Sequence, residues 1–316
     1  MANPPDKSIT VPTLAILLCT YEGERHVAEQ LSSIEEQTLR DWKLWVSDDG
    51  SLDATLSIVN DFAANWGGNK VSVRRGPCAG FVANFMSLIC DQDIRADFYA
   101  FSDQDDIWLS GKSHRAIAWL QTIPEGVPAL YCARTRLVDE GNHDIGLSPL
   151  LARAPGFANA LVQNIGSGNT MVFNNAARSL LLATGPEVEV FAHDWWAYLL
   201  VSGAGGCVSY DPEPSVRYRQ HASNQIGVAA GVSAALYRLR SMMQGRYKAW
   251  NGKHVEALMR VRDVLTAEHR ATLAVFARAR SRWLVPRVLG FLRAGVYRQT
   301  LLGNIGLAVA ALLNKV

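Results

Sequence analysis

The sequence has 316 residues, of which 49% are hydrophobic and 19% charged, and its formal net charge is +2. This balance excludes a disordered chain, and the near-neutral charge gives no reason to expect a nucleic-acid partner. The five cysteines are scattered and never form a C-x-x-C pair, so neither a disulfide framework nor a zinc site is predicted. Residues 1–12 lack the basic and apolar regions of a secretory signal, and we expect an N-terminal tail and a cytoplasmic location.

Short β-rich runs alternate with helical segments from Thr13 to about Pro149, which is typical of a parallel sheet covered by helices. The predicted strands are Leu14–Cys19, Lys43–Ser47, Val71–Arg74, Phe98–Ser102 and Ala129–Ala133. The predicted helices are Arg25–Glu36, Asp53–Trp66, Val82–Asp91 and Lys112–Gln121. We therefore expect an α/β fold.

The next stretch, from Asn159 to Gln225, has a mixed pattern. It predicts a strand at Thr170–Phe173, a helix at Ala176–Ala183, a helix from His193 and two further short strands. Pro212 and Pro214 interrupt the last pair and indicate an edge or a turn there. After about Val228 the strand signals disappear, and the remainder predicts helices broken by Gly and Pro.

Acidic residues follow the fourth predicted strand directly, as Asp103-Gln104-Asp105-Asp106. Ligands of such sheets bind outside the carboxyl ends of the strands. Carboxylates this close together repel and raise one another's pKa unless a cation lies among them. The run therefore predicts a Mg²⁺ or Mn²⁺ site completed by substrate phosphates; the alternative is a solvated turn that caps the next helix.

Two other strand ends carry polar residues. Thr20-Tyr21-Glu22 follows the first strand, and Asp48-Asp49-Gly50-Ser51 the second. An aspartate there can accept hydrogen bonds from the imide N–H of uracil or thymine, or from ribose hydroxyls. Asp and Gly also favour ordinary turns, so both interpretations remain open.

The order of three segments resembles glycosyltransferase family 2, whose members share the GT-A fold. These segments are Thr20-Tyr21, Ser47-Asp-Asp-Gly-Ser51 and Ser102-Asp-Gln-Asp-Asp-Ile-Trp108. The segment Glu29–Thr38 is similar to the family's first helix, and Gly80-Phe81 with Asn84-Phe85 is closer to the rhamnosyltransferase-like branch than to cellulose or chitin synthases. The resemblance extends to about Gly227.

The resemblance implies a Rossmann-like, mixed but mostly parallel sheet flanked by helices, followed by a C-terminal helical appendage. We accordingly expect a GT-A domain at residues 13–228 and a helical region at 229–316. Within the domain, residues 13–110 would form the nucleotide-binding half and 111–228 the acceptor and catalytic half.

The strand ends and the resemblance together imply three sets of site residues. The expected nucleotide-sugar site comprises Thr20, Tyr21, Glu22, Asp48, Asp49, Arg75, Gly80, Asn84, Ser102, Asp103, Gln104, Asp105 and Arg219. The expected acceptor and sugar pocket comprises Asp106, Trp108, Gly168, Asn169, His193, Trp195 and Trp196. The expected metal ligands are Asp103, Asp105 and His221, with Mg²⁺ or Mn²⁺ as the ion.

Asp194, in His193-Asp194-Trp195-Trp196, resembles the position of the family's catalytic aspartate, which usually follows a glutamate. An inverting transfer needs a carboxylate that takes the proton of the attacking hydroxyl, and we assign this role to Asp194. Without the resemblance, the segment would predict a helix N-cap followed by core aromatics. We expect one tryptophan in the core and the other against a sugar face.

The segment Tyr218-Arg219-Gln220-His221 resembles the end of the family's domain. Arg219 would neutralise the leaving diphosphate, because a guanidinium pairs well with phosphate oxygens, and His221 would ligate the metal. Processive members carry Gln-x-x-Arg-Trp at a comparable stage, and this chain does not, so we predict the transfer of a single sugar.

The expected reaction moves a sugar from a dTDP- or UDP-linked donor to a saccharide or a polyprenyl-diphosphate-linked saccharide in cell-surface polysaccharide synthesis. One alternative is a nucleotidyltransferase, which would need a Gly-rich basic loop where this chain has Glu22 and Glu24. A dehydrogenase would need G-x-G-x-x-G after the first strand. A catalytically degenerate scaffold would bind nucleotide or glycan without turnover.

Two apolar stripes near the C-terminus predict amphipathic helices. They are Val285, Leu289, Leu292 and Val296, and then Leu301, Ile305, Ala308 and Leu312. Interrupting polar residues exclude a membrane span. Two interpretations remain open: packing on the catalytic domain or a homodimer partner, and peripheral docking on the inner face of an anionic membrane.

Overall fold

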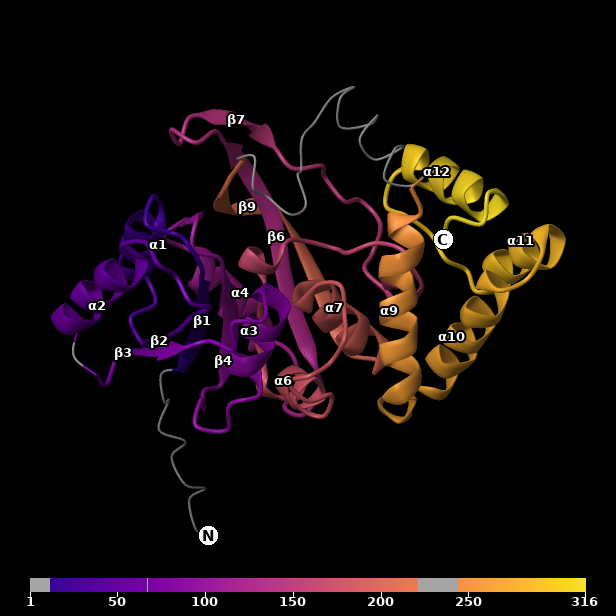
Figure 1. The fold of residues 1–316 in the computed structure, drawn as a ribbon. Coiled ribbons are helices and arrows are strands. Elements are labelled where there is room, and N and C mark those ends of the chain that lie inside the picture. Colours follow the sequence, from indigo (N-terminus) through magenta and orange to yellow (C-terminus); the bar gives the residue numbers. More distant parts are fainter. Residues whose placement is uncertain (1–11, 67, 221–243) are drawn as a thin grey trace, which may run out of the picture.

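The computed structural model describes residues 12–66, 68–220 and 244–316. The described residues form one mixed sheet of nine strands in the order β3-β2-β1-β4-β8-β6-β9-β5, with β7 paired to β6 (Figure 1). The strands are β1 Leu14–Thr20, β2 Trp42–Asp48, β3 Val71–Arg75, β4 Phe98–Ser102, β5 Ile107–Trp108, β6 Ala129–Val138, β7 Asp144–Leu147, β8 Val172–Asn174 and β9 Cys207–Arg219.

The first half of the sheet is parallel. β1 lies between β2 and β4, with Leu14 opposite both Trp42 and Phe98, and β3 pairs with β2 on the outside. All seven residues of β1 are buried, as expected of a parallel strand covered by helices on both faces. The parallel pairing brings the carboxyl ends of β1 to β4 to one edge of the sheet, and this edge positions the candidate site.

The second half of the sheet changes direction. The short strand β8 runs antiparallel to both β4 and β6, β6 pairs parallel with β9, and β5 pairs antiparallel with β9. The β6–β9 register shifts between Ala133 and Thr135. The mixed, mostly parallel sheet that we expected is therefore confirmed.

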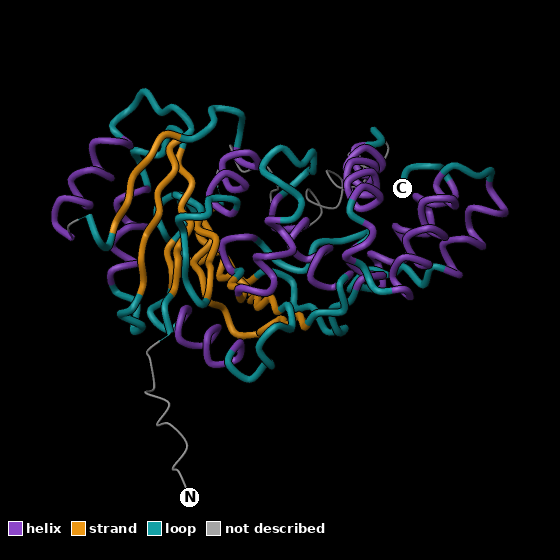
Figure 2. Tube along the Cα trace, turned by 90° about the horizontal axis from the view of Figure 1, so that it is seen from below, coloured by secondary structure: helices purple, strands orange, loops and turns teal. Residues whose placement is uncertain are grey.

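Helices cover both faces of the sheet (Figure 2). Leu14, Ile16 and Leu18 of β1 point into the core under α1, α2 and α4, whereas Ala15 and Leu17 point into the core under α3, α5, α6 and α7. The first group is α1 Val27–Glu35, α2 Thr55–Trp66 and α4 Lys112–Leu120. The second group is α3 Phe81–Ile89, α5 Phe157–Ala160, α6 Asn175–Leu182 and α7 His193–Gly203.

The C-terminal helices extend the second layer beyond α7 (Figure 1). They are α9 Arg246–Arg260, α10 Ala267–Arg280, α11 Leu284–Arg293 and α12 Leu301–Leu312, with a short 3₁₀ turn at Arg262–Val264. Leu258, Leu265 and Phe276 join the core cluster that contains Trp196 of α7. None of the helices in the described part of the chain is both long and apolar enough to span a bilayer.

Two expectations about local structure are corrected. The two short strands expected around Pro212 and Pro214 are one strand, β9, because the register shift against β6 absorbs the prolines. The strand expected at Thr170–Phe173 starts at Val172, since Gly168–Thr170 forms a 3₁₀ turn. The short strands β5 and β7 were not expected from the sequence.

Candidate active site

A cavity of about 420 Å³ lies at the carboxyl ends of β2 and β3. Its lining combines carboxylate, guanidinium and aliphatic side chains. The lining residues are Asp48, Gly50, Ser51, Leu52, Leu56, Asn60, Val73, Arg74 and Arg75. Two of the expected nucleotide-sugar residues, Asp48 and Arg75, thus share one concave surface.

Asp48 shapes the wall of this cavity through four hydrogen bonds. Its Oδ1 accepts from the hydroxyls of Thr20, at 2.8 Å, and Ser51, at 2.6 Å. Its Oδ2 accepts from the backbone N–H groups of Gly50, at 3.1 Å, and Ser51, at 2.9 Å. Gly50 has φ +96°, a conformation that favours glycine. The segment from Asp48 to Ser51 is therefore a turn, and it also borders the cavity.

Asp49 ties the loop after β3 to the end of β2. Its carboxylate accepts from the backbone N–H groups of Cys78, at 2.7 Å, and Gly80, at 2.8 Å. Asn84 of α3 is buried beneath the loop, where its Nδ2 donates to the Ser47 carbonyl at 2.9 Å. Its Oδ1 has no hydrogen-bond partner among the described residues. Asp49, Gly80 and Asn84 are therefore brought together, as expected, at the loop between β3 and α3.

The loops after β1 and β4 are joined by a reciprocal pair of hydrogen bonds. The Tyr21 N–H donates to Gln104 Oε1 at 2.8 Å, and Gln104 Nε2 donates to the Tyr21 carbonyl at 2.8 Å. The Tyr21 side chain is 58% exposed, so its ring is presented to solvent. Glu22 Oε1 accepts from the Leu52 N–H at 2.8 Å, which connects the first loop to the rim of the cavity.

The charges of two other carboxylates, from two distant segments, act on Asp103 beside these loops. Burial, followed by the charges of Asp105 and Asp194, raises the pKa of Asp103 to about 8. Burial likewise raises the pKa of Asp194 to about 6. Gly168 bonds Asp194 and its neighbour Asn169 bonds Asp106, so the acidic run after β4 and the first turn of α7 lie close together, although they are far apart in the sequence. A single cation would relieve the repulsion among these groups.

The donor set fits a hard divalent ion, because carboxylate oxygens are the ligands that Mg²⁺ and Mn²⁺ prefer. Within the described ranges, no three His, Cys, Asp or Glu side chains converge to hold a metal ion by themselves. One or two carboxylates plus substrate phosphates commonly complete such sites. The expected ligand His221 lies outside the described residues.

Asp194 is oriented by backbone donors. The Gly168 N–H donates to its Oδ2 at 3.0 Å, and the Trp195 N–H donates to its Oδ1 at 2.6 Å. These bonds, with one from the Asn164 side chain, oppose the rise in pKa that burial causes. The carboxylate has a fixed direction and retains lone pairs for an incoming hydroxyl.

His193 lies among phenylalanines. Its ring stacks on Phe85, with centroids 3.8 Å apart, and meets the edges of Phe101, at 4.7 Å, and Phe81, at 6.0 Å. Neither ring nitrogen has a hydrogen-bond partner within the described part of the chain. Burial lowers the pKa of His193 to about 3, so the ring is neutral. No local pattern in the sequence predicts these three contacts, because they come from α3 and β4.

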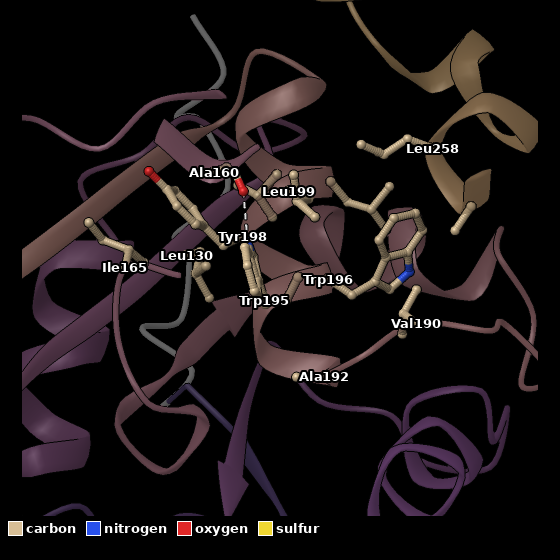
Figure 3. Packing of buried hydrophobic residues seen from close by; sticks show 14 of the residues in the cluster. Leu130, Ala160, Ile165, Val190, Ala192, Trp195, Trp196, Tyr198, Leu199 and Leu258 are labelled. Carbon is tan, nitrogen blue, oxygen red and sulfur yellow. Dashed lines mark hydrogen bonds between the residues drawn. The ribbon is translucent and has the colours of Figure 1, made fainter. Parts of the chain in front are cut away.

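Trp108, Trp195 and Trp196 all lie in the core, whereas we expected only one of Trp195 and Trp196 there. Trp195 is 6% exposed and donates from Nε1 to the Ala160 carbonyl at 2.6 Å, and Trp196 is fully buried (Figure 3). Trp108 is 2% exposed on the opposite face, with the Lys112 ammonium 3.4 Å from its ring centroid. The reason is local: α7 is buried along its whole length, and the pairing of β5 with β9 fixes Trp108 beneath α4.

Arg219 connects the acidic run to α1. Its guanidinium forms an ion pair with Glu29 and donates to the carbonyl oxygens of Asp105, at 3.0 Å, and Glu140, at 2.6 Å. The Arg219 side chain is 2% exposed. Its donors thus bind the protein, rather than facing an open diphosphate site as we expected. Glu29, which sequence reasoning did not assign to the site, is its acidic partner.

Asp106 is also built into the protein. Its carboxylate accepts hydrogen bonds from the Asn169 side chain and, at 3.3 Å, from the Arg219 N–H. Burial and the charges of Asp105 and Asp103 raise the pKa of Asp106 well above its usual value. Asp106 and Asn169, both expected in the acceptor pocket, are therefore in contact with each other and buried.

Comparisons with known proteins agree with this arrangement. Residues 15–173 match the model of glycosyl transferase family 2. The dTDP-rhamnosyl transferase RfbG of Shigella flexneri is 31% identical over 255 residues, which cover 76% of this chain and 84% of RfbG.

Two solved structures have a similar fold. The S. aureus TarS 1–349 complex with UDP-GlcNAc matches with a TM-score of 0.53 and 16% identity, over 90% of this chain and 93% of that one. The mannosyltransferase PcManGT of Pyrobaculum calidifontis, in complex with GDP-Man and Mn²⁺, matches with a TM-score of 0.50 and 16% identity, over 97% and 86%. The chain therefore belongs to glycosyl transferase family 2 and is a glycosyltransferase that uses a nucleotide-sugar donor.

Proposed function

We propose that the chain catalyses the inverting, metal-dependent transfer of one rhamnose from dTDP-rhamnose to a saccharide or lipid-linked saccharide acceptor of a cell-surface polysaccharide. The observation that carries the proposal is that the neighbouring residues Gly168 and Asn169 bond Asp194 and Asp106, which brings α7 to the acidic run that holds Asp103 and Asp105. The similarity to a dTDP-rhamnosyl transferase supports the donor.

The cavity suits a pyrimidine nucleotide. Asp48 and Arg75 supply polar groups, while Leu52, Leu56 and Val73 supply apolar contacts that a thymine methyl group can use. The exposed ring of Tyr21 offers a face on which a base can stack. The same lining accepts uracil, since the imide edges of the two bases are identical, and a UDP-linked sugar is the second candidate donor.

Asp103 and Asp105 are the described residues that would hold the divalent ion. The PcManGT complex, which has a similar fold, contains Mn²⁺ together with GDP-Man. The bound ion would offset the negative charge that grows on the leaving nucleotide. Arg219 would hold the acidic loop in position through its bond to the Asp105 carbonyl.

Asp194 would act as the base. Its two oxygens are oriented by backbone N–H groups, and its raised pKa brings it closer to neutrality, where a general base works best. The acceptor hydroxyl loses its proton to Asp194 as its oxygen bonds to the anomeric carbon and the bond to the diphosphate breaks. Attack from the opposite face inverts the anomeric centre, and no covalent protein intermediate is needed.

The test is release of nucleotide diphosphate from dTDP-rhamnose and from a panel of UDP-sugars, with Mn²⁺ or with chelator. We expect turnover with dTDP-rhamnose and metal, and we expect Asp194→Asn to lower kcat about 10²- to 10⁴-fold while dTDP binding is retained. Asp61→Asn, on the exposed side of α2, is the matched control. Binding of dTDP without turnover of any sugar nucleotide would indicate a degenerate scaffold and contradict the proposal.

A further inference from the structure

Helix α11 turns its apolar side chains outward. Val285, Leu289 and Leu292 are 51%, 49% and 71% exposed, and their spacing of four and three residues places them on one face. The opposite face carries Arg287 and Phe291, which are buried. Surface helices normally have the reverse arrangement, with the apolar stripe against the core.

The rotation of α11 about its axis is fixed by specific contacts. The Arg287 guanidinium donates to the carbonyl oxygens of Arg282, at 3.0 and 2.8 Å, and Ala311, at 3.0 Å, which joins α11 to the end of α12. A Cβ at Gly290 would lie 2.5 Å from Ala279 Cβ, so this side of α11 packs closely on α10. Hiding the leucines would require these contacts to break.

Helix α12 has the same inverted pattern. Leu301, Leu302 and Ile305 are 78%, 81% and 52% exposed, while the buried residues are Ala310 and Ala311. Trp283, just before α11, is 68% exposed. We call the exposed apolar residues of these two helices the α11–α12 face. They are Trp283, Leu284, Val285, Leu289, Leu292, Leu301, Leu302, Ile305, Val309, Leu312 and Leu313. α11 and α12 are in contact through the Arg287–Ala311 hydrogen bond, and exposed apolar side chains gathered on two adjacent helices mark an interaction site.

The charge around the face distinguishes between partners. Residues 271–316 contain six arginines and one lysine, but no Asp or Glu. Arg282 and Arg293 are exposed and directly adjoin the face residues Trp283 and Leu292 in the sequence. A second copy of the chain would bring the same positive charges to the contact and be repelled. Anionic lipid headgroups complement both the arginines and the apolar residues.

We infer that the α11–α12 face docks on an anionic lipid bilayer, with both helices lying in the interface. The twelve residues of α12 rise about 18 Å at 1.5 Å per residue, well short of the roughly 30 Å hydrocarbon core. The exposed Trp283 has the amphipathic ring that favours the headgroup region. This inference goes beyond the proposed transfer reaction and does not depend on the identity of the donor.

The experiment is co-sedimentation of the full chain with vesicles of phosphatidylcholine alone or mixed with phosphatidylglycerol. We expect binding to the mixed vesicles to be about tenfold stronger. Leu292→Glu with Leu302→Glu should weaken it by about tenfold or more, because both side chains are exposed and the change places charge in the apolar interface. Met259→Glu, at an exposed apolar residue of α9 outside the face, is the matched control and should leave binding unchanged.

A second variant tests the electrostatic part. Arg282→Gln with Arg293→Gln should weaken binding to the mixed vesicles but not to phosphatidylcholine alone, and added salt should have the same effect. The inference is overturned if the wild type fails to sediment with the mixed vesicles, or if the double-glutamate variant binds as well as the wild type. A dimer in light scattering that dissociates in this variant, without vesicle binding, would assign the face to a second copy instead.

Nucleotide release from the donor is measured in the same variants. It should be unchanged, since the face lies outside the carboxylate cluster. Lost vesicle binding with retained turnover separates this inference from the proposed function, so either can fail alone.

Discussion

The backbone N–H of Gly168 donates a hydrogen bond of 3.0 Å to Oδ2 of Asp194. The two residues belong to different elements, the 3₁₀ turn before β8 and the first turn of α7. The approach depends on the absence of a side chain at Gly168, because a Cβ there would lie 2.9 Å from His193 Nε2 and 3.1 Å from Asp194 Cβ. Gly168 therefore sets the direction of the proposed base.

Gly168→Ala should impair transfer more than donor binding. The added methyl group must push His193 and Asp194 away, and a displacement of about 1 Å at a catalytic group can lower the rate about 100-fold. We expect kcat to fall about 10- to 100-fold, with little change in the Kd for dTDP. Steady-state kinetics and calorimetry provide the two measurements.

Gly306→Ala is the matched control, because a Cβ at Gly306 of α12 meets nothing within 4 Å. It should leave kcat unchanged. A Gly168→Ala enzyme with wild-type kcat would show that Asp194 does not need this position.

Transfer should be lost as the solution becomes acidic through the pKa of Asp194, which burial raises to about 6. The proposed base is active when deprotonated, so activity is present above this pKa and falls below it, by about tenfold per pH unit. His193 should add no second step in this range, since burial lowers its pKa to about 3 and the ring stays neutral. The measurement is kcat/KM for the acceptor against pH, and a flat profile between about pH 5 and 7 would refute the assignment.

The parallel half of the fold could be predicted from the sequence because each strand is a short apolar run that ends in a polar segment. Phe98–Ser102 is found with the expected bounds, and the helix expected from Lys112 begins there. The strand ends also identify the edge of the sheet that carries the site. Parallel pairing brings Thr20, Asp48 and Ser102 to this edge, independently of the second half of the sheet.

The position of the antiparallel strand β8 could not be predicted. It pairs with β4 and β6, which lie far from it in the sequence, and no local sequence pattern indicates these pairings. β7 is only four residues long and exposed at all four, so the alternation in Asp-Ile-Gly-Leu is too short to signal a strand. The burial of Trp195 could not be decided either, since a helix start followed by aromatics suits a pocket wall and a core equally. Only the family resemblance singled out Asp194.

Asp48→Asn should destabilise the fold and weaken donor binding together. The amide Nδ2 would face either the N–H groups of Gly50 and Ser51, with which it cannot pair, or the Thr20 and Ser51 hydroxyls, which must then turn to accept from it. Losing satisfied partners at a buried group costs about 1–3 kcal/mol in the free energy of unfolding. The Ser51 turn that lines the cavity would shift, so KM for the donor should rise as well.

Denaturant unfolding and donor kinetics test this prediction, with Asp61→Asn as the exposed control on α2. If donor KM rises without any loss of stability, Asp48 binds the nucleotide directly rather than through the turn.

Glu29→Gln distinguishes two roles for Arg219. If Arg219 positions the acidic loop, removing the charge of its partner Glu29 should loosen the loop, and both Glu29→Gln and Arg219→Lys should raise the Mn²⁺ concentration required for half-maximal activity. If Arg219 instead binds the diphosphate directly, Glu29→Gln would release its guanidinium and strengthen dTDP binding. Titration of activity with Mn²⁺, beside calorimetry with dTDP, separates these two roles of Arg219.

The control is Glu35→Gln, at an exposed residue at the end of α1. We expect the metal requirement to rise about threefold to tenfold in both variants, because three donors of one buried guanidinium bind α1, the loop and the β6–β7 turn at once.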